Sequence, residues 1–301
     1  MIARLALAAA LLLPAPACAQ TAPQPAPSTA AANDADPALW VVKDADTTVY
    51  LFGTIHVLKP GVTWFDEGVK KSFDSADTLV LEMVQPPQAE MAQLIATRAA
   101  APAGPALPDK LPPKDRDAYK AALTGLGLPV TAFDRTDPWF AAMNLSLLPV
   151  MKLGYDPTNG PEEVLSAAAK QSAKKVVGLE TAAQQIGFFD GISDAGQVAF
   201  LTSTVRDLPK IGATLDEMVG EWSRGDVEAL AETVNEGVDE IPEVRRVLLT
   251  DRNANWAKWI AQRMKTPGTV FVAVGAGHLA GKGSVQDDLG AYKLKAVRVS
   301  Y

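Results

Sequence analysis

The 301-residue chain has only two histidines, and each stands three residues after a glycine at the end of an apolar run. The first run ends in Gly53-Thr-Ile-His56 and the second in Gly275-Ala-Gly-His278. Short runs rich in Val, Phe and Tyr that stop at a glycine are typical of buried β-strands. Side chains just beyond such strands face the edge of a sheet, where open α/β sheets bind ligands. The two imidazoles are therefore candidates for one functional site, and the alternative is a pair of satisfied core histidines.

Two glutamates repeat this pattern. The apolar runs at 78–81 and 176–179 end in Glu82 and Glu180. A carboxylate at the end of a buried strand is costly unless it is paired or binds a metal. If the four runs are parallel strands of one sheet, as the helical segments between them indicate, the four side chains meet at its carboxyl edge. We expect a metal centre of two histidines and one or two glutamates there. For each glutamate alone, the alternative is a solvated strand end or a salt bridge to an arginine.

The order of predicted elements indicates an α/β (α+β) fold with a central mixed sheet, whose metal site lies at the C-terminal edge of the strands. Large helical insertions are expected at about 86–172 and 181–264, within one globular domain that spans 38–301. The Ala/Pro-rich stretch 99–113 is expected to be a loop. The pattern further predicts a β-hairpin from 39–43 and 48–52, a final strand at 294–299, and helices at 64–74, 114–126, 138–153 and 161–171.

Residues 1–19 are typical of a secretory signal peptide, with a basic start at Arg4, a short apolar stretch and a small-residue cleavage site. The stretch is too short to cross a bilayer. Cleavage would remove Cys18, the only cysteine, and the alternative is a lipoprotein anchored at Cys18. We therefore expect a periplasmic or secreted protein that meets a membrane only if Cys18 is lipidated. A disordered Ala/Pro-rich tether is expected at 20–37.

Charge argues against a nucleic-acid partner. Without Arg4, 27 of the 28 basic residues remain against 35 acidic ones, which gives a net charge of −8. No basic patch large enough for nucleic acid stands out in the sequence. A peptide or an ester is the expected class of substrate.

A helix predicted near residue 250 carries a charge within an apolar stripe. Steps of four place Leu248, Arg252, Trp256 and Ile260 on one face. An inward guanidinium can hold a carboxylate of the site or neutralise an oxyanion. The alternative is an arginine whose stem packs while its head reaches water.

Three other functional motifs would involve some of the same residues, but the sequence lacks the elements that each of them requires. The segment 275–280 formally fits the dinucleotide fingerprint, but no complete βαβ unit follows it and no acid lies ~20 residues further on. Gly281-Lys282 lacks the first glycine of a P-loop and the Ser or Thr after the lysine. A serine hydrolase is weakly supported, because the chain has no G-x-S-x-G.

Six blocks in this order resemble the signature of the TraB/GumN family across residues 37–301. These blocks are Pro37-Ala-Leu-Trp40, Tyr50-Leu-Phe-Gly-Thr-Ile-His56, Leu79-Val-Leu-Glu82, Gly178-Leu-Glu-Thr181, Arg252-Asn253 and Val274-Gly-Ala-Gly-His-Leu279. The resemblance implies a divalent-metal-dependent hydrolase, with Mn or Co as family-typical ions. The animal relatives, the Tiki proteins, are membrane-tethered metalloproteases, and there is a distant similarity to erythromycin esterase and haem-binding ChaN-like proteins.

The family's histidines carry over to His56 and His278, and its acidic positions to Glu82 and Glu180. The segment Gly160-Pro-Glu-Glu163 departs from the family's usual Gly-Val-Asp-like sequence, so no role carries over to an acid there.

Together these observations give a mechanistic hypothesis. His56, Glu82 and His278 bind one metal ion (Mn, Co or Zn; mixed N/O ligation also suits Fe) and leave a position open for water. Glu180 acts as general base or as a further ligand, and Arg252 steadies the oxyanion of a peptide or ester carbonyl. The rival hypotheses are a non-catalytic periplasmic metal- or haem-binding protein and a degenerate scaffold that keeps only the fold.

Overall fold

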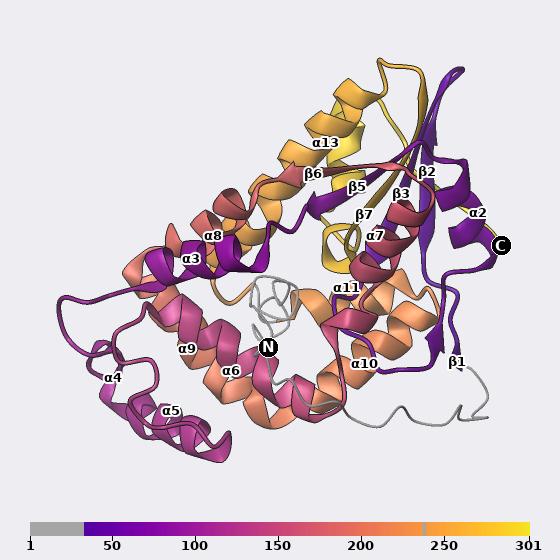
Figure 1. The fold of residues 1–301 in the computed structure, drawn as a ribbon. Helices are drawn as coiled ribbons and strands as arrows, with labels where there is room; N and C mark the ends of the chain where they lie inside the picture. Colours follow the sequence, from indigo (N-terminus) through magenta and orange to yellow (C-terminus); the bar gives the residue numbers. More distant parts are fainter. Residues whose placement is uncertain (1–32, 237–238) are drawn as a thin grey trace.

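A computed structural model describes residues 33–236 and 239–301, and Figure 1 shows their arrangement. The predicted signal peptide at 1–19, with Cys18, and the tether up to residue 32 lie outside the described residues. The tether prediction is wrong for its last residues. Strand β1 (Asn33–Asp34) pairs with β4 (Val62–Thr63), and Ala35 is buried. Backbone pairing and burial of a small apolar side chain therefore fix this segment to the domain.

Six strands form one mixed sheet in the order β6-β5-β7-β3-β2-β8. Their bounds are β2 (Leu39–Lys43), β3 (Thr47–Thr54), β5 (Thr78–Met83), β6 (Lys175–Glu180), β7 (Gly268–Gly275) and β8 (Val297–Arg298). The α/β fold class, the opening β2–β3 hairpin and the four parallel strands are confirmed. The predicted final strand at 294–299 is shorter, because β8 pairs with β2 only at Arg298 and Val297.

Both faces of the sheet are buried, and strand β7 shows how its sequence achieves this. Val270, Val272 and Val274 pack on one face with helix α13 (Asp251–Arg263), whereas Phe271 and Ala273 pack on the other. Successive side chains of a strand point to opposite faces, so a continuous apolar run fills two cores. Because β7 lies between β3 and β5, the last long strand of the sequence is central to the sheet.

Helices cover both faces and form a separate cluster beside the sheet (Figure 1). The face with Phe271 is covered by α2 (Glu67–Ser75), α7 (Pro161–Gln171), α10 (Ile211–Ser223) and α11 (Val227–Asn235), and the opposite face by α13 and α14 (Val285–Leu289). The separate cluster contains α3 (Gln88–Ala99), α4 (Leu107–Lys110), α5 (Pro113–Gly125), α6 (Pro138–Lys152), α8 (Ala182–Asp190), α9 (Asp194–Asp207) and α12 (Pro242–Arg245).

The expected loop at 99–113 is therefore interrupted by a helical turn. Helix α4 forms there because Leu107 is fully buried and Pro108 occupies a first-turn position, where its missing N–H costs nothing. Across the part of the chain that the structure describes, no helix combines the length and the apolar character needed to span a bilayer.

The central position of β7 makes a testable prediction for stability. Phe271 is fully buried and its ring packs against Phe52 and Phe73. We expect Phe271→Ala to lower the free energy of unfolding by ~3–5 kcal/mol in urea titrations, since it leaves a cavity. The control Tyr292→Ala, at a side chain 43% exposed, should change it by less than ~0.5 kcal/mol. Equal losses in the two variants would contradict the central placement of β7.

Candidate functional site

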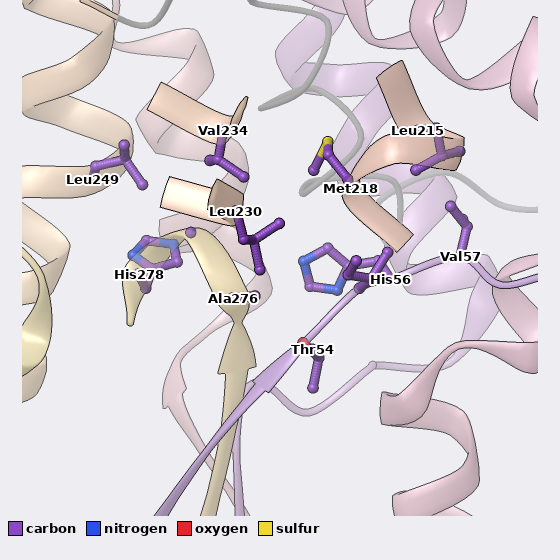
Figure 2. Close-up of a pocket in the computed structure, with 13 residues that line it drawn as sticks. Thr54, His56, Val57, Leu215, Met218, Leu230, Val234, Leu249, Ala276 and His278 are labelled. Atoms are coloured by element: carbon purple, nitrogen blue, oxygen red, sulfur yellow. The ribbon is translucent and has the colours of Figure 1, made fainter. Parts of the chain in front are cut away.

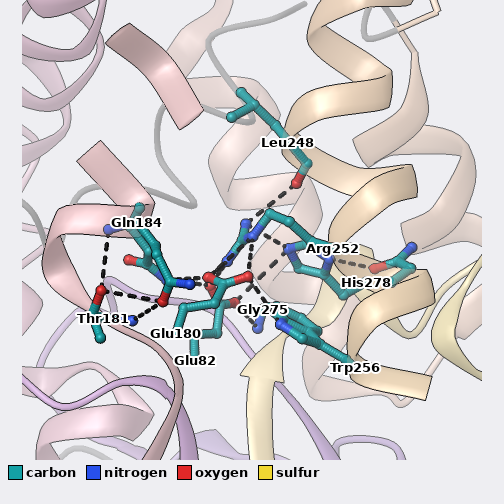
Figure 3. Close-up of polar contacts among 11 residues, drawn as sticks. Glu82, Glu180, Thr181, Gln184, Leu248, Arg252, Trp256, Gly275 and His278 are labelled. Atoms are coloured by element: carbon teal, nitrogen blue, oxygen red, sulfur yellow. Dashed lines mark hydrogen bonds and ion pairs between the residues drawn. The ribbon is translucent and has the colours of Figure 1, made fainter. Parts of the chain in front are cut away.

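The carboxyl edge of the parallel strands gathers all five residues that the sequence predicts. Glu82 lies in β5 and Glu180 ends β6, whereas His56 follows β3 and His278 ends the 3-10 turn η5 (Ala276–His278) after β7. Arg252 reaches Glu82, Glu180 and His278 from the first turn of α13 (Figure 3). The histidines meet because β3 and β7 are neighbours in register, with Thr54 opposite Gly275. Their spacing in the sequence did not reveal this adjacency.

Arg252 is the centre of the polar cluster in Figure 3. Its Nε donates to Glu180 Oε1 at 2.9 Å, and its Nη2 donates to Glu180 Oε2 at 2.8 Å and to Glu82 Oε2 at 2.5 Å. Its Nη1 donates to the Leu248 carbonyl at 3.2 Å and contacts His278 Nε2 at 3.1 Å. Burial alone would lower the pKa of this guanidinium, but the two carboxylates raise it. The arginine therefore stays charged and joins three of the predicted site residues.

The helix turn directly before Arg252 is irregular, and this irregularity helps the side chain to point toward the site. Residues Arg246–Thr250 form the π-helical turn η4, which continues directly into α13. Such turns loosen the regular ladder of a helix and are frequent at functional sites. The Leu248 carbonyl of this turn accepts a hydrogen bond from the guanidinium. The turn thus helps to hold the inward side chain that the sequence pattern indicated.

Glu180 has little hydrogen-bonding capacity left. In addition to Arg252, its Oε1 accepts from Trp256 Nε1 at 2.9 Å and its Oε2 accepts from Gln185 Nε2 at 3.0 Å. A carboxylate whose two oxygens both accept charged or neutral donors is well placed to orient an arginine. It is less well placed to remove a proton from water.

Glu82 is ionised by its surroundings. Burial alone would raise its pKa, but the charges of Arg252 and the nearby histidines, together with the Gly275 N–H, lower it to about 2. The Gly275 N–H donates to Oε1 at 2.7 Å, and this oxygen lies 3.9 Å from His278 Nε2. Glu82 thus presents a carboxylate oxygen beside an imidazole nitrogen.

His278 is neutral and has a defined tautomer. Its Nδ1 lies 2.6 Å from Asn253 Oδ1, an acceptor only, so Nδ1 carries the proton and the Nε2 lone pair faces Arg252 Nη1 at 3.1 Å. Burial and the charge of Arg252 lower its pKa to about 3. Asn253, which the sequence placed in a block beside Arg252, therefore orients the imidazole from α13.

His56 is held in the same way by a residue that the sequence hypothesis did not assign. Its Nδ1 lies 2.6 Å from Glu162 Oε1 in the first turn of α7, and Thr54 Oγ1 donates to that same oxygen. Burial would lower the pKa of His56, but Glu162 and Glu82 raise it. Both ring nitrogens are buried and neither makes an aligned hydrogen bond to a described residue, so Nδ1 contacts Glu162 as an ion pair and Nε2 has no hydrogen-bond partner. The sequence signal at Glu162, an acid after Pro161, indicated only a helix start.

Gly275 shows how closely these groups approach one another. A methyl group on its Cα would lie 3.1 Å from Glu82 Oε1, 3.2 Å from His56 Nε2 and 3.6 Å from His278 Cδ2. The two rings are therefore much closer than the ~10 Å beyond which one ion could not bind both. Only a glycine leaves this space open. This steric constraint explains why a glycine stands at position 275, at the start of the second Gly-x-x-His.

The donor types at this space suit a divalent metal, although they do not form a ready cage. Among residues 33–236 and 239–301, no group of three His, Cys, Asp or Glu side chains is already arranged to hold an ion. The unpartnered Nε2 of His56, the Nε2 lone pair of His278 and Glu82 Oε1 nevertheless border one space. Each imidazole has an oxygen 2.6 Å from its Nδ1, and metal-binding histidines usually have such a partner at the second ring nitrogen. A metal ion could bind His278 Nε2 only if the Arg252 Nη1 group moved away from this atom.

These environments predict two separate histidine titrations. In the metal-free protein, the imidazole C–H signals in proton NMR should titrate at about pH 3 for His278 and above 6.5 for His56. Glu162→Gln should lower the pKa of His56, because it removes the main charge that raises it, and should leave His278 unchanged. Coincident titration of both rings near 6.5 would contradict the described contacts.

The same shifts predict a loss of stability in acid. In the unfolded chain, His278 takes up a proton near pH 6.5 and Glu82 near pH 4.5, whereas in the folded protein they do so only near 3 and 2. Unfolding therefore takes up protons, and the free energy of unfolding should fall as the pH drops from 6.5 towards 2. His56 has a raised pKa and acts in the opposite direction only above 6.5. Urea titrations between pH 7 and 3 measure the slope, and a free energy that does not change with pH would contradict it.

Comparison with known proteins places this site in a family. The sequence model of the TraB/PrgY/gumN family matches residues 38–297. The "Uncharacterized protein YbaP" of Escherichia coli (strain K12) is 26% identical over 254 residues, which cover 83% of this chain and 90% of the relative. The protein of the same name from Shigella flexneri gives the same values. No solved structure matches the chain. Because the family match covers most of the chain, with β2, β3, β5, β6 and β7 in full and every residue of the described site, the chain belongs to the TraB/PrgY/gumN family.

Proposed function

We propose that this protein is a metal-dependent hydrolase whose metal ion would be held by His56, Glu82 and His278. The observation that supports it is the common arrangement of the two rings. An oxygen lies 2.6 Å from Nδ1 of each ring, and the two rings border one space together with Glu82 Oε1. Two satisfied core histidines would not leave a buried Nε2 without a partner.

His56, Glu82 and His278 would hold the metal, and Mn, Co and Zn all suit two imidazoles and a carboxylate. A divalent ion supplies a Lewis acid that lowers the pKa of bound water. Glu162 and Asn253 would orient the two imidazoles through their Nδ1 atoms. Neutral His278, whose pKa lies at about 3, needs no deprotonation before it can act as a ligand.

Arg252 would stabilise the oxyanion that forms when water attacks a carbonyl group. Its guanidinium is charged, buried and held at several points, so little reorganisation is needed as negative charge develops. Glu180 would hold this arginine in place. It can serve as general base only if Arg252 turns away, because its oxygens now accept from Arg252, Trp256 and Gln185.

The rival haem-binding function is less compatible with the space at the histidines. The cavity that the two rings line has a volume of about 40 Å³, which is far smaller than a porphyrin. Non-catalytic binding of a metal ion would use the same residues. Only a measurement of substrate turnover distinguishes it from hydrolysis. The resemblance to the Tiki proteins favours a peptide over an ester as substrate.

The proposed location follows from the sequence of residues 1–19. Cleavage of the predicted signal peptide would release the hydrolase into the periplasm or the medium, and lipidation of Cys18 would instead anchor it to a membrane. The predicted substrate is then a peptide or an ester outside the cytoplasm.

Metal analysis of the dialysed protein tests this proposal. We expect about one equivalent of Mn, Co or Zn in the parent protein and a loss of at least tenfold in metal affinity in His56→Ala and His278→Ala, since each removes a ligand. Metal-dependent cleavage of a peptide library should be lost in the same two variants. Glu221→Gln is the matched control, because Glu221 is a buried acid outside the site.

Circular dichroism would check that each variant folds. Full metal retention in both histidine variants would rule out these ligands. Metal binding without cleavage of peptides or esters under any condition would favour the non-catalytic function instead.

A further inference from the structure

The cavity beside the two imidazoles is enclosed by two pairs of elements (Figure 2). The ends of β3 and β7, with His56 and His278, line one side. Helices α10 and α11 line the other side with Leu215, Met218, Leu230 and Val234, and Leu249 of η4 closes it near His278. The Trp222 Nε1 donates to the Gly53 carbonyl at 2.8 Å, which fixes α10 to the end of β3. The roof of the cavity is thus tied to the strand that carries His56.

The lining is almost entirely apolar. Apart from the two imidazoles, its polar side chain is that of Thr54, whose hydroxyl already donates to Glu162. A charged or amide group placed among Met218, Leu230 and Val234 would lose its hydrogen bonds to water without replacement, which is costly. The polar atom that offers a new contact is the partnerless Nε2 of His56. An occupant therefore needs an aliphatic part for the cavity and a polar group that faces the imidazoles.

The cavity is also small. Its volume is about 40 Å³. A cavity that holds one water molecule needs ~10–15 Å³, so this space is of the order of a few non-hydrogen atoms. A methyl or an isopropyl group fits this space, whereas a longer or aromatic side chain does not.

The wall of the cavity is closely packed at the second Gly-x-x-His. A methyl group on Gly277 would lie 2.7 Å from Val234 Cγ1, so the turn after β7 directly contacts α11. Met218 and Leu230 are both at most 7% exposed and cannot swing into solvent. The size of the cavity is therefore set by these side chains.

We propose that this cavity is a specificity pocket for a small aliphatic group, of alanine to valine size, next to the carbonyl group that is hydrolysed. This inference rests on the proposed hydrolase function, since the imidazoles that would hold the metal line the pocket. The aliphatic group is the side chain of a peptide residue or the acyl group of an ester. Both place a carbonyl beside the imidazoles when the aliphatic part is buried.

Binding to the full, metal-free protein tests the pocket without any turnover. The probes are the N-acetyl N-methylamides of Gly, Ala, Val, Leu, Phe and Lys, and the ethyl esters of acetic, isobutyric and hexanoic acid. With only two histidines in the chain, ligand entry is read from their two imidazole signals in proton NMR. We expect the Ala and Val amides, or the two short esters, to shift both signals, and the Leu, Phe and Lys amides to bind at least tenfold more weakly.

Two variants on different helices test which side chains set the size limit. Met218→Ala and Leu230→Ala should each improve binding of the Leu amide or the hexanoate ester relative to the small probes by at least tenfold. Val219→Ala is the matched control on α10, because Val219 does not line the cavity. If one enlarged variant fails to fold, the other still gives the comparison.

Equal binding of large, charged and small probes, or an unchanged preference in both enlarged variants, would overturn the pocket. The predicted preference without hydrolysis under any metal would support the pocket and refute the proposed function. A hydrolysis rate that does not depend on the size of the aliphatic group would refute the specificity pocket but not the proposed hydrolase function.

Discussion

A single buried positive charge between two carboxylates is the interaction on which this site depends. Glu82 and Glu180 end neighbouring strands, and without a cation between them their burial would be strongly unfavourable. Arg252 supplies that cation from α13 and contacts both carboxylates. Removing one partner of such a group leaves an uncompensated charge, at a cost of ~3–5 kcal/mol. The cluster therefore fastens helix α13 to the carboxyl edge of the sheet.

The same charge determines the state of the histidines. Burial and the charge of Arg252 keep His278 neutral, and Arg252 contacts its Nε2, whereas His56 has Glu162 as its partner. A metal ion at this space would be repelled by the guanidinium and attracted by Glu82. The site thus stays assembled without a metal, and a cation that binds both imidazoles would have to displace the Arg252 contact at His278 Nε2.

The sequence predicted the main features of this arrangement. Apolar runs that end in His56, Glu82, Glu180 and His278 correctly indicated parallel strands with a common carboxyl edge, because a buried strand has a clear local pattern. The stripe around Arg252 likewise indicated an inward guanidinium. The adjacency of β3 and β7 did not follow from the sequence, since pairing between strands more than 200 residues apart leaves no local signal.

Other features depended on tertiary contacts in the same way. Glu162 and Asn253 act through the Nδ1 atoms of the histidines, and each comes from a helix whose own pattern reports only its start and its buried face. The loop expected at 99–113 contains α4, because burial of Leu107 outweighed the Ala/Pro-rich composition. The small cavity depends on how α10 and α11 pack on two strand ends, which no single segment specifies.

The proposed function requires the two imidazoles, far apart in the sequence, to share one cation-binding space. An anomalous-scattering map from crystals grown with Zn²⁺ or Mn²⁺ locates the ion. We expect one peak between His56 Nε2 and His278 Nε2, at ~2.0–2.2 Å from each and from the Glu82 carboxylate. A map with no peak at that position at saturating metal, or with the ion bound at other residues while His56 Nε2 stays free, would contradict it.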